Sequence, residues 1–133
     1  MEQNKILEFN KKCAIFIGAK HYNDDPENFP EGYWLLDDED CDIDLPYFLS
    51  DMTFHSDRNL IMKISEAIVA QGFRQYTISH EAFSRCVLTD MSILEQKHNF
   101  DGGNIVADSG ECGEYIQALV AAIDKFFTWY YGR

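Results

Sequence analysis

The stretch from Leu45 to Gly72, LPYFLSDMTFHSDRNLIMKISEAIVAQG, contains the best-marked helix start in the chain. Ser56 or Asp57 is suited to cap that start, because a short side-chain oxygen accepts hydrogen bonds from the free N–H groups of a first helical turn. The apolar residues behind the cap recur at helical spacing, and they are Leu60, Ile61, Ile64, Ala67 and Ile68. Glycine is a common residue just past a helix end. The stretch therefore predicts a central helix over 56–72 with one face in the core.

The segments on either side of this stretch predict two more helices and a small sheet. Residues 1–18 carry an apolar stripe at helical spacing, as do residues 108–132, where Asp108 or Ser109 is suited to cap the helix. Residues 73–107 are rich in β-formers and predict an antiparallel hairpin followed by one further strand. The stripe of the last helix is wide enough to be largely buried and consists of Ile116, Leu119, Val120, Ile123, Phe126, Phe127 and Tyr130.

Residues 19–55 lack a sustained period, and Pro and Gly interrupt them. They predict a long acidic loop that contains one short strand, Tyr33 to Leu36, and loops of this length are often functional. The whole chain, 1–133, is expected to be a single domain of the α+β class. Three main helices and a small, mostly antiparallel sheet must cover one another's apolar faces, which predicts a helix–sheet–helix sandwich.

The formal net charge of −12 is concentrated in one segment. Between His21 and Asp57 there are twelve Asp and Glu residues and no Lys or Arg, whereas the other eleven acidic residues are matched by eleven basic ones. Direct binding to a phosphate backbone requires Lys and Arg, so we expect no direct nucleic-acid binding. A basic protein surface is the expected partner. The candidate partner-binding residues are the carboxylates of the densest run: Asp37, Asp38, Glu39, Asp40, Asp42 and Asp44.

The chain has no sign of export or of membrane insertion. Its first residues lack a basic region followed by an apolar run, and no stretch approaches the roughly 20 apolar residues of a membrane span. The four cysteines form no CxxC pair, and they fit buried thiols better than a disulfide framework. We therefore expect a reduced protein of the cytoplasm.

Several motifs, in matching order along most of the chain, resemble a known family. Cys13-Ala14 to Gly18 ends the first helix, Tyr33-Trp34 forms a strand, LPYFLSDMTFHSD opens the central helix, and Trp129-Tyr130 closes the last one. The chain thus resembles the phage ABA sandwich domain proteins, the BC1872-like set of small phage and prophage proteins, with Arg58 where that family has Trp. The resemblance implies a helix–sheet–helix sandwich encoded by a phage or an integrated element. It implies no catalytic residue, because the family has no established activity.

The most conspicuous polar group consists of Asp51, His55 and Asp57. A histidine between two carboxylates suits a general base or a metal ligand, and His80 is the one further ligand that the sequence suggests. The alternative is structural, because such side chains also bond backbone groups at a chain reversal and a helix start. The structural interpretation is preferred, so no catalytic residue, metal or cofactor is predicted.

Two other arrangements are open as alternatives. Asp40, Asp42, Asp44 and Asp51 have spacing like the calcium ligands of an EF-hand loop, but Leu45 stands where that loop requires Gly, which leaves calcium binding by clustered carboxylates. Cys86 is a candidate for a thiol–imidazole pair with His80 or His98. Its place in an alternating strand pattern, however, predicts that Cys86 is packed in the core.

The favoured function is that of a small accessory protein of a phage or prophage in the host cytosol, acting by binding rather than by catalysis. One form of it is an acidic inhibitor of a basic host or defence protein, in which Asp and Glu imitate phosphates. A metal-dependent hydrolase that uses Asp51, His55 and Asp57 is the first alternative. A homo-oligomeric structural module that assembles through its aromatic C-terminal helix is the second.

Overall fold

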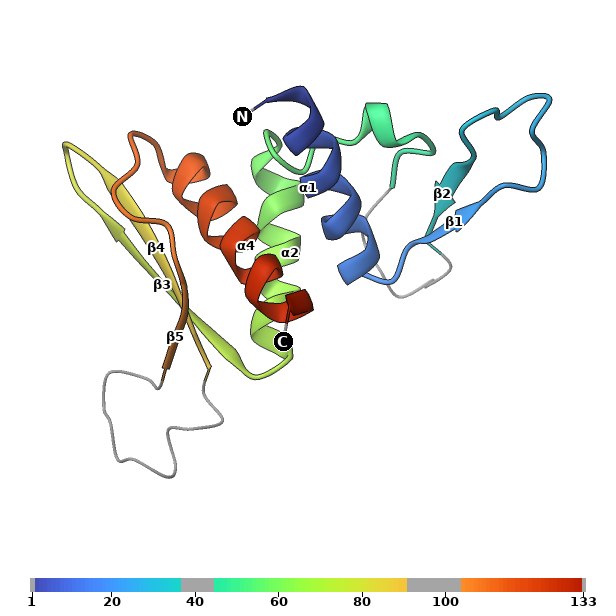
Figure 1. Ribbon diagram of the computed structural model, residues 1–133. Helices are drawn as coiled ribbons and strands as arrows, with labels where there is room; N and C mark the ends of the chain where they lie inside the picture. Colours follow the sequence, from blue (N-terminus) through green and yellow to red (C-terminus); the bar gives the residue numbers. More distant parts are fainter. Residues whose placement is uncertain (1, 37–44, 91–103, 133) are drawn as a thin grey trace. The chain divides into compact units, whose positions relative to one another are not determined.

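The computed structural model describes residues 2–36, 45–90 and 104–132 (Figure 1). Within these residues the chain forms three α-helices and two small antiparallel sheets, so the predicted α+β class is confirmed. The chain divides into two compact units, residues 1–64 and 65–133, and the boundary falls inside helix α2, Arg58–Ala70. The single domain over 1–133 stays a prediction.

The N-terminal unit begins with helix α1, Gln3–Phe16, inside the range predicted for the first helix. Strands β1, Lys20–Tyr22, and β2, Tyr33–Leu35, then pair antiparallel, with His21 opposite Trp34. The sequence predicted β2 but not β1, because three residues with a Lys and a His show no alternation of apolar and polar side chains. A short 3₁₀-helix, η1, Leu49–Asp51, precedes α2.

Helix α2 begins and ends close to its predicted limits. Asp57 Oδ1 accepts hydrogen bonds from the N–H groups of Asn59 and Leu60, at 2.9 and 3.2 Å, so Asp57 is the cap. Gly72 follows the helix with a φ of +100°, a left-handed conformation that glycine adopts without the clash of a Cβ atom. The predicted apolar stripe is buried at Ile61, Ile64 and Ile68.

The C-terminal unit contains a three-stranded sheet in the order β3-β4-β5 (Figure 1). The predicted hairpin is formed by β3, Phe73–Ser79, and β4, Ser84–Asp90, which pair antiparallel over their whole length. The predicted further strand is β5, Asn104–Asp108, which pairs antiparallel with β4. Both expectations for this sheet are confirmed.

Helix α4, Tyr115–Gly132, packs against β4 and β5 on one face of this sheet (Figure 1). Phe73 of β3 meets Phe126 and Trp129 edge-on, at ring-centroid distances of 5.0 and 5.8 Å. The wide apolar stripe predicted for this helix is confirmed, because most of it is buried. The buried residues of α4 are Ala118, Leu119, Val120, Ala122, Ile123, Phe126 and Phe127.

The predicted start of the last helix at 108 is wrong. Asp108 ends β5, and its carboxylate accepts two hydrogen bonds from the Arg85 guanidinium of β4, one of them at 2.9 Å from Nε. Ser109 Oγ accepts the N–H of Cys86 at 2.8 Å. Both side chains therefore bind the neighbouring strand, and the helix begins at Tyr115.

Candidate functional site

The three predicted polar residues each have a structural environment of their own in the N-terminal unit. Asp51 is the last residue of η1 and is exposed. Asp57 caps α2 through its Oδ1. His55 lies between them in the chain and contacts Asn10 of α1. The described part of the chain contains no group of three or more His, Cys, Asp or Glu side chains placed to hold a metal ion.

His55 is held by Asn10, which was not among the residues predicted to form a site. Asn10 is 1% exposed, its Oδ1 accepts the His55 N–H at 3.2 Å, and its Nδ2 lies 3.1 Å from His55 Nδ1. The same Nδ2 donates to the Met52 carbonyl at 2.9 Å. One amide thus joins α1 to the turn before α2. The sequence contains one weak signal for this role. Asn10 is a polar residue beside the apolar stripe of the first helix, between Phe9 and Cys13.

Burial lowers the pKa of His55 from its ordinary 6.5. The unfolded chain then binds more protons than the folded chain between the lowered pKa and 6.5, so stability falls as the pH drops through that window. We expect the wild type to lose more stability than His55→Gln between about pH 7.5 and pH 5, because the other histidines are common to both proteins. Urea unfolding at a series of pH values measures this, and equal pH slopes would contradict it.

The thiol–imidazole alternative does not fit the C-terminal unit. The Cys86 side chain is fully buried, and this burial raises its pKa to about 11, which disfavours the nucleophilic thiolate. His80 stacks on Phe83 with a centroid distance of 5.5 Å. The predicted buried packing of Cys86 is therefore confirmed, while His98 lies outside the described residues.

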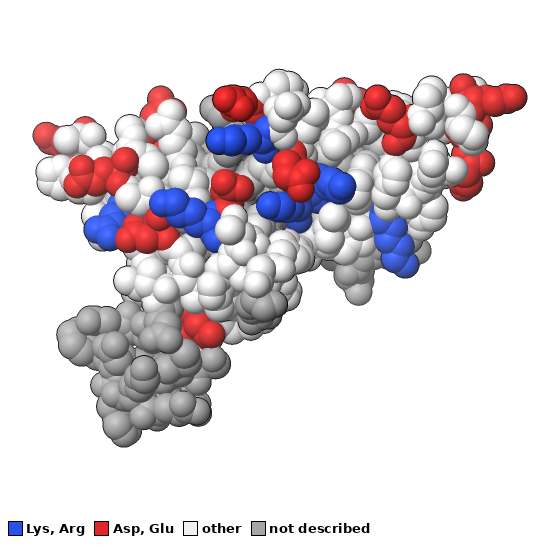
Figure 2. All heavy atoms as spheres, in the orientation of Figure 1, with Lys and Arg blue, Asp and Glu red and all other residues white. Residues whose placement is uncertain are grey.

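The predicted partner-binding carboxylates fall where the structure gives no description. All six lie outside the described residues: Asp37, Asp38, Glu39, Asp40, Asp42 and Asp44. Three of the four carboxylates with EF-hand-like spacing are among them, and only Asp51 is described. The described remainder of the acidic segment is the loop between β1 and β2. Asp24, Glu27 and Glu31 are exposed there, and Figure 2 shows acidic side chains gathered at the tip of this hairpin.

An apolar pocket of about 380 Å³ lies beside the same hairpin. Its described lining consists of Phe29, Tyr33, Leu35, Tyr47 and Phe48, and we call it the aromatic pocket. The ring of Phe29 lies 5.0 Å from that of Tyr33 and 5.7 Å from that of Phe48. Tyr47 is 62% exposed and Phe48 39%. Large apolar side chains left this exposed in one place are typical of a binding surface.

A backbone hydrogen bond holds the two sides of this pocket together. The Trp34 N–H of β2 donates to the Tyr47 carbonyl at 2.7 Å, so the segment before η1 runs beside β2. This arrangement was not predicted from the sequence, in which Tyr47 and Phe48 precede the more conspicuous polar residues 50–57. The signal available was the frequency of aromatic residues among the carboxylates of 21–57.

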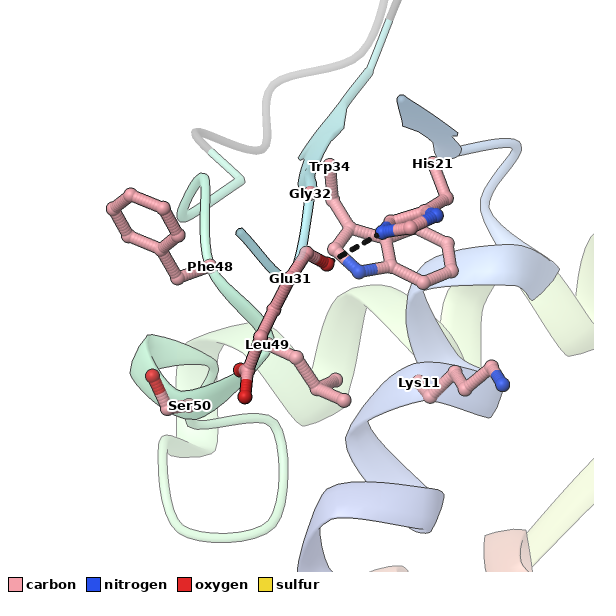
Figure 3. Close-up of a pocket in the computed structure, with 8 residues that line it drawn as sticks. All are labelled: Lys11, His21, Glu31, Gly32, Trp34, Phe48, Leu49 and Ser50. Carbon is pink, nitrogen blue, oxygen red and sulfur yellow. Dashed lines mark hydrogen bonds between the residues drawn. The ribbon is translucent and has the colours of Figure 1, made fainter. Parts of the chain in front are cut away.

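A second pocket of about 450 Å³ shares Phe48 with the aromatic pocket (Figure 3). His21 and Trp34 lie side by side in it, with ring centroids 4.9 Å apart, and His21 Nε2 is 3.0 Å from the Glu31 carbonyl (dashed line in Figure 3). Lys11 from α1 gives this pocket a mixed charge. The lining consists of Lys11, His21, Glu31, Gly32, Trp34, Phe48, Leu49 and Ser50.

Gly32 is required for the close approach of the two strands at this pocket. Its φ is +77°, and a Cβ atom there would lie 2.4 Å from His21 Nε2 and 2.5 Å from the Tyr22 carbonyl oxygen. Any larger residue would therefore push the His21 ring and β1 away from β2. The hairpin geometry and the pocket depend on this one glycine.

Comparison with protein-family models, with curated proteins and with solved structures gave no match. The resemblance to the phage ABA sandwich domain thus rests on the motifs of the sequence alone.

No helix in the described ranges is both long enough and apolar enough to cross a membrane.

Proposed function

We propose that this chain is a small accessory protein of a phage or prophage that acts by binding a basic protein surface through its acidic segment, residues 21–57. The observation that carries the proposal is the placement of charge. This segment holds twelve carboxylates and no Lys or Arg, while the rest of the chain is balanced. A segment rich in carboxylates and free of Lys and Arg attracts a basic partner over distances of about a Debye length, ~8–10 Å in physiological salt.

The described part of the segment supports a recognition surface rather than a merely solubilising loop. Asp24 accepts the Tyr33 hydroxyl at 2.9 Å, and Asp25 accepts the Asn28 amide at 2.9 Å. These bonds fix the orientation of two carboxylates on the hairpin. The hairpin lies beside two pockets and beside the exposed side chains of Tyr47 and Phe48, the exposed aromatic pair. A binding surface commonly joins aromatic contacts in its centre to charges at its rim.

The inhibitor form of this proposal gives the acidic run a definite role. Asp and Glu side chains would occupy the sites at which a nucleic-acid-handling host or defence protein binds phosphates. Support comes from the sequence, in which six carboxylates lie within residues 37–44. The phage or prophage origin is supported by the motif resemblance described above.

Affinity capture with a charge-matched control tests the proposal. We expect the immobilised wild type to retain basic proteins from bacterial lysate, and the variant Asp38→Asn/Asp40→Asn/Asp42→Asn/Asp44→Asn to lose them. A control with the same change of net charge, Glu8→Gln/Glu81→Gln/Glu111→Gln/Glu114→Gln, alters only exposed residues outside the segment and should keep them. Raising the salt should weaken capture by the wild type.

Two results would contradict the proposal: capture that is insensitive to salt, or equal loss in both variants. Thermal unfolding of both variants serves as the control for folding. The Asn changes should be nearly neutral or slightly stabilising, because they ease repulsion among the carboxylates. A large loss of stability would instead mean that the acidic run is built around a cation or a buried pair.

A further inference from the structure

We propose that the aromatic pocket receives an arginine side chain of the basic partner. This inference rests on the proposed function and names the contact by which the partner is recognised. It is carried by an apolar pocket walled by aromatic rings, together with the Asp24 carboxylate that is hydrogen-bonded to the Tyr33 hydroxyl.

The walls of the pocket suit a flat, weakly hydrated cation. Four of its five described lining residues are aromatic, and two of them, Tyr47 and Phe48, are well exposed. The face of an aromatic ring carries negative electrostatic potential and attracts a cation within about 6 Å of its centroid. The volume of about 380 Å³ falls within the range of specific ligand pockets.

The charge at the rim is complementary to a cation. Asp24 Oδ1 lies 2.9 Å from the hydroxyl of Tyr33, whose ring lines the pocket. This hydrogen bond to the carboxylate raises the pKa of Tyr33, so the phenol stays neutral and keeps the Asp24 carboxylate at the rim. Of the other described carboxylates of the hairpin loop, Glu27 and Glu31 are exposed and Asp25 is half-buried.

Arginine fits these features better than lysine does. A guanidinium is planar, stacks on aromatic faces and sheds its hydration at lower cost, whereas an ammonium is a compact and strongly hydrated charge. A guanidinium stacked between rings still presents its N–H groups edge-on to a carboxylate. Because Phe48 lines both pockets, a partner segment that crosses this ring also has the second pocket for a neighbouring side chain.

A titration with isosteric peptides tests the assignment. The probes are short capped peptides of Gly and Ser with one central arginine, citrulline or lysine, added to the full ¹⁵N-labelled chain. Citrulline has the shape of arginine but no charge. We expect the arginine peptide to shift the resonances of residues 29–35 and 45–49 with a dissociation constant on the order of 1–10 mM. We expect the citrulline and lysine peptides to bind at least about threefold more weakly.

Two variants locate the site. Tyr47→Leu and Phe48→Leu remove ring faces but keep apolar volume. Each should raise the dissociation constant of the arginine peptide about threefold or more. Tyr131→Leu is the matched control, since Tyr131 is 47% exposed and lies in the C-terminal unit, and it should change nothing. The NMR spectrum of each variant shows directly whether it is folded.

Equal binding of the citrulline or lysine peptide, no shift with the arginine peptide, or no effect of either pocket variant would overturn the assignment. These outcomes are distinct from a failure of the proposed function. If basic proteins are captured through the acidic run but the Leu variants capture them equally well, the partner is bound by charge alone and the aromatic pocket is not its site.

Discussion

Replacing Ile123 by alanine is expected to lower the free energy of unfolding by about 2–5 kcal/mol. Ile123 lies in α4, and its side chain is fully buried. The substitution removes three carbon atoms from a close-packed interior, and the loss combines transfer free energy with the cost of the cavity that remains. Urea unfolding followed by circular dichroism measures the change.

The matched control for this change is Ile15→Ala. Ile15 also lies in a helix, α1, but is 43% exposed. Alanine has the higher helix propensity, so the control should be within about 0.5 kcal/mol of the wild type or slightly more stable. A small effect of Ile123→Ala, comparable to that of Ile15→Ala, would contradict the burial of Ile123 in α4.

The helices and the larger sheet were predictable because their signals are local and periodic. In α4 the apolar residues recur over five turns, and the side chains at those positions are the buried ones. In the β3–β4 hairpin, β-formers flank a four-residue join, so pairing follows from proximity in the chain. Burial of one face selects the helix, and alternate burial along β4 with a short join selects the hairpin.

The start of the last helix was predicted wrongly because a polar side chain can accept hydrogen bonds from more than one set of donors. Asp108 and Ser109 look like helix caps in the sequence, but an arginine and a backbone N–H of β4 compete for the same oxygens. Asp57, with the same chemistry, does cap its helix. The difference lies in which donors the fold brings near, and spacing along the chain does not contain that information.

The candidate site was predictable in location but not in its contacts. Uneven charge directs attention to residues 21–57, and the described pockets lie largely within that segment. The aromatic pocket, however, is created by a hydrogen bond from Trp34 to the Tyr47 carbonyl, thirteen residues away along the chain. Such a tertiary contact leaves no periodic trace in the sequence.

Replacing Asn10 by leucine is expected to lower the free energy of unfolding by about 2–4 kcal/mol. Leucine has a similar size, so the change keeps the packing volume and removes the hydrogen bonds to the Met52 carbonyl and the His55 N–H. Each buried backbone group left without a partner costs about 1–3 kcal/mol. Asn4→Leu, at an exposed position of the same helix, is the matched control and should be close to neutral.

Hydrogen exchange separates this local role from a general loss of packing. If Asn10 holds the turn before α2, the amide of His55 should exchange faster in Asn10→Leu by more than the overall loss of stability explains, because its acceptor is gone. The amide of Ile61 donates to the Asp57 carbonyl at 3.0 Å, and its exchange rate should change only as much as the global stability changes. Parallel changes at His55 and Ile61 would mean that Asn10 acts through the packing of α1. A selective change at His55 would mean that one buried amide positions the chain between the exposed aromatic pair and α2.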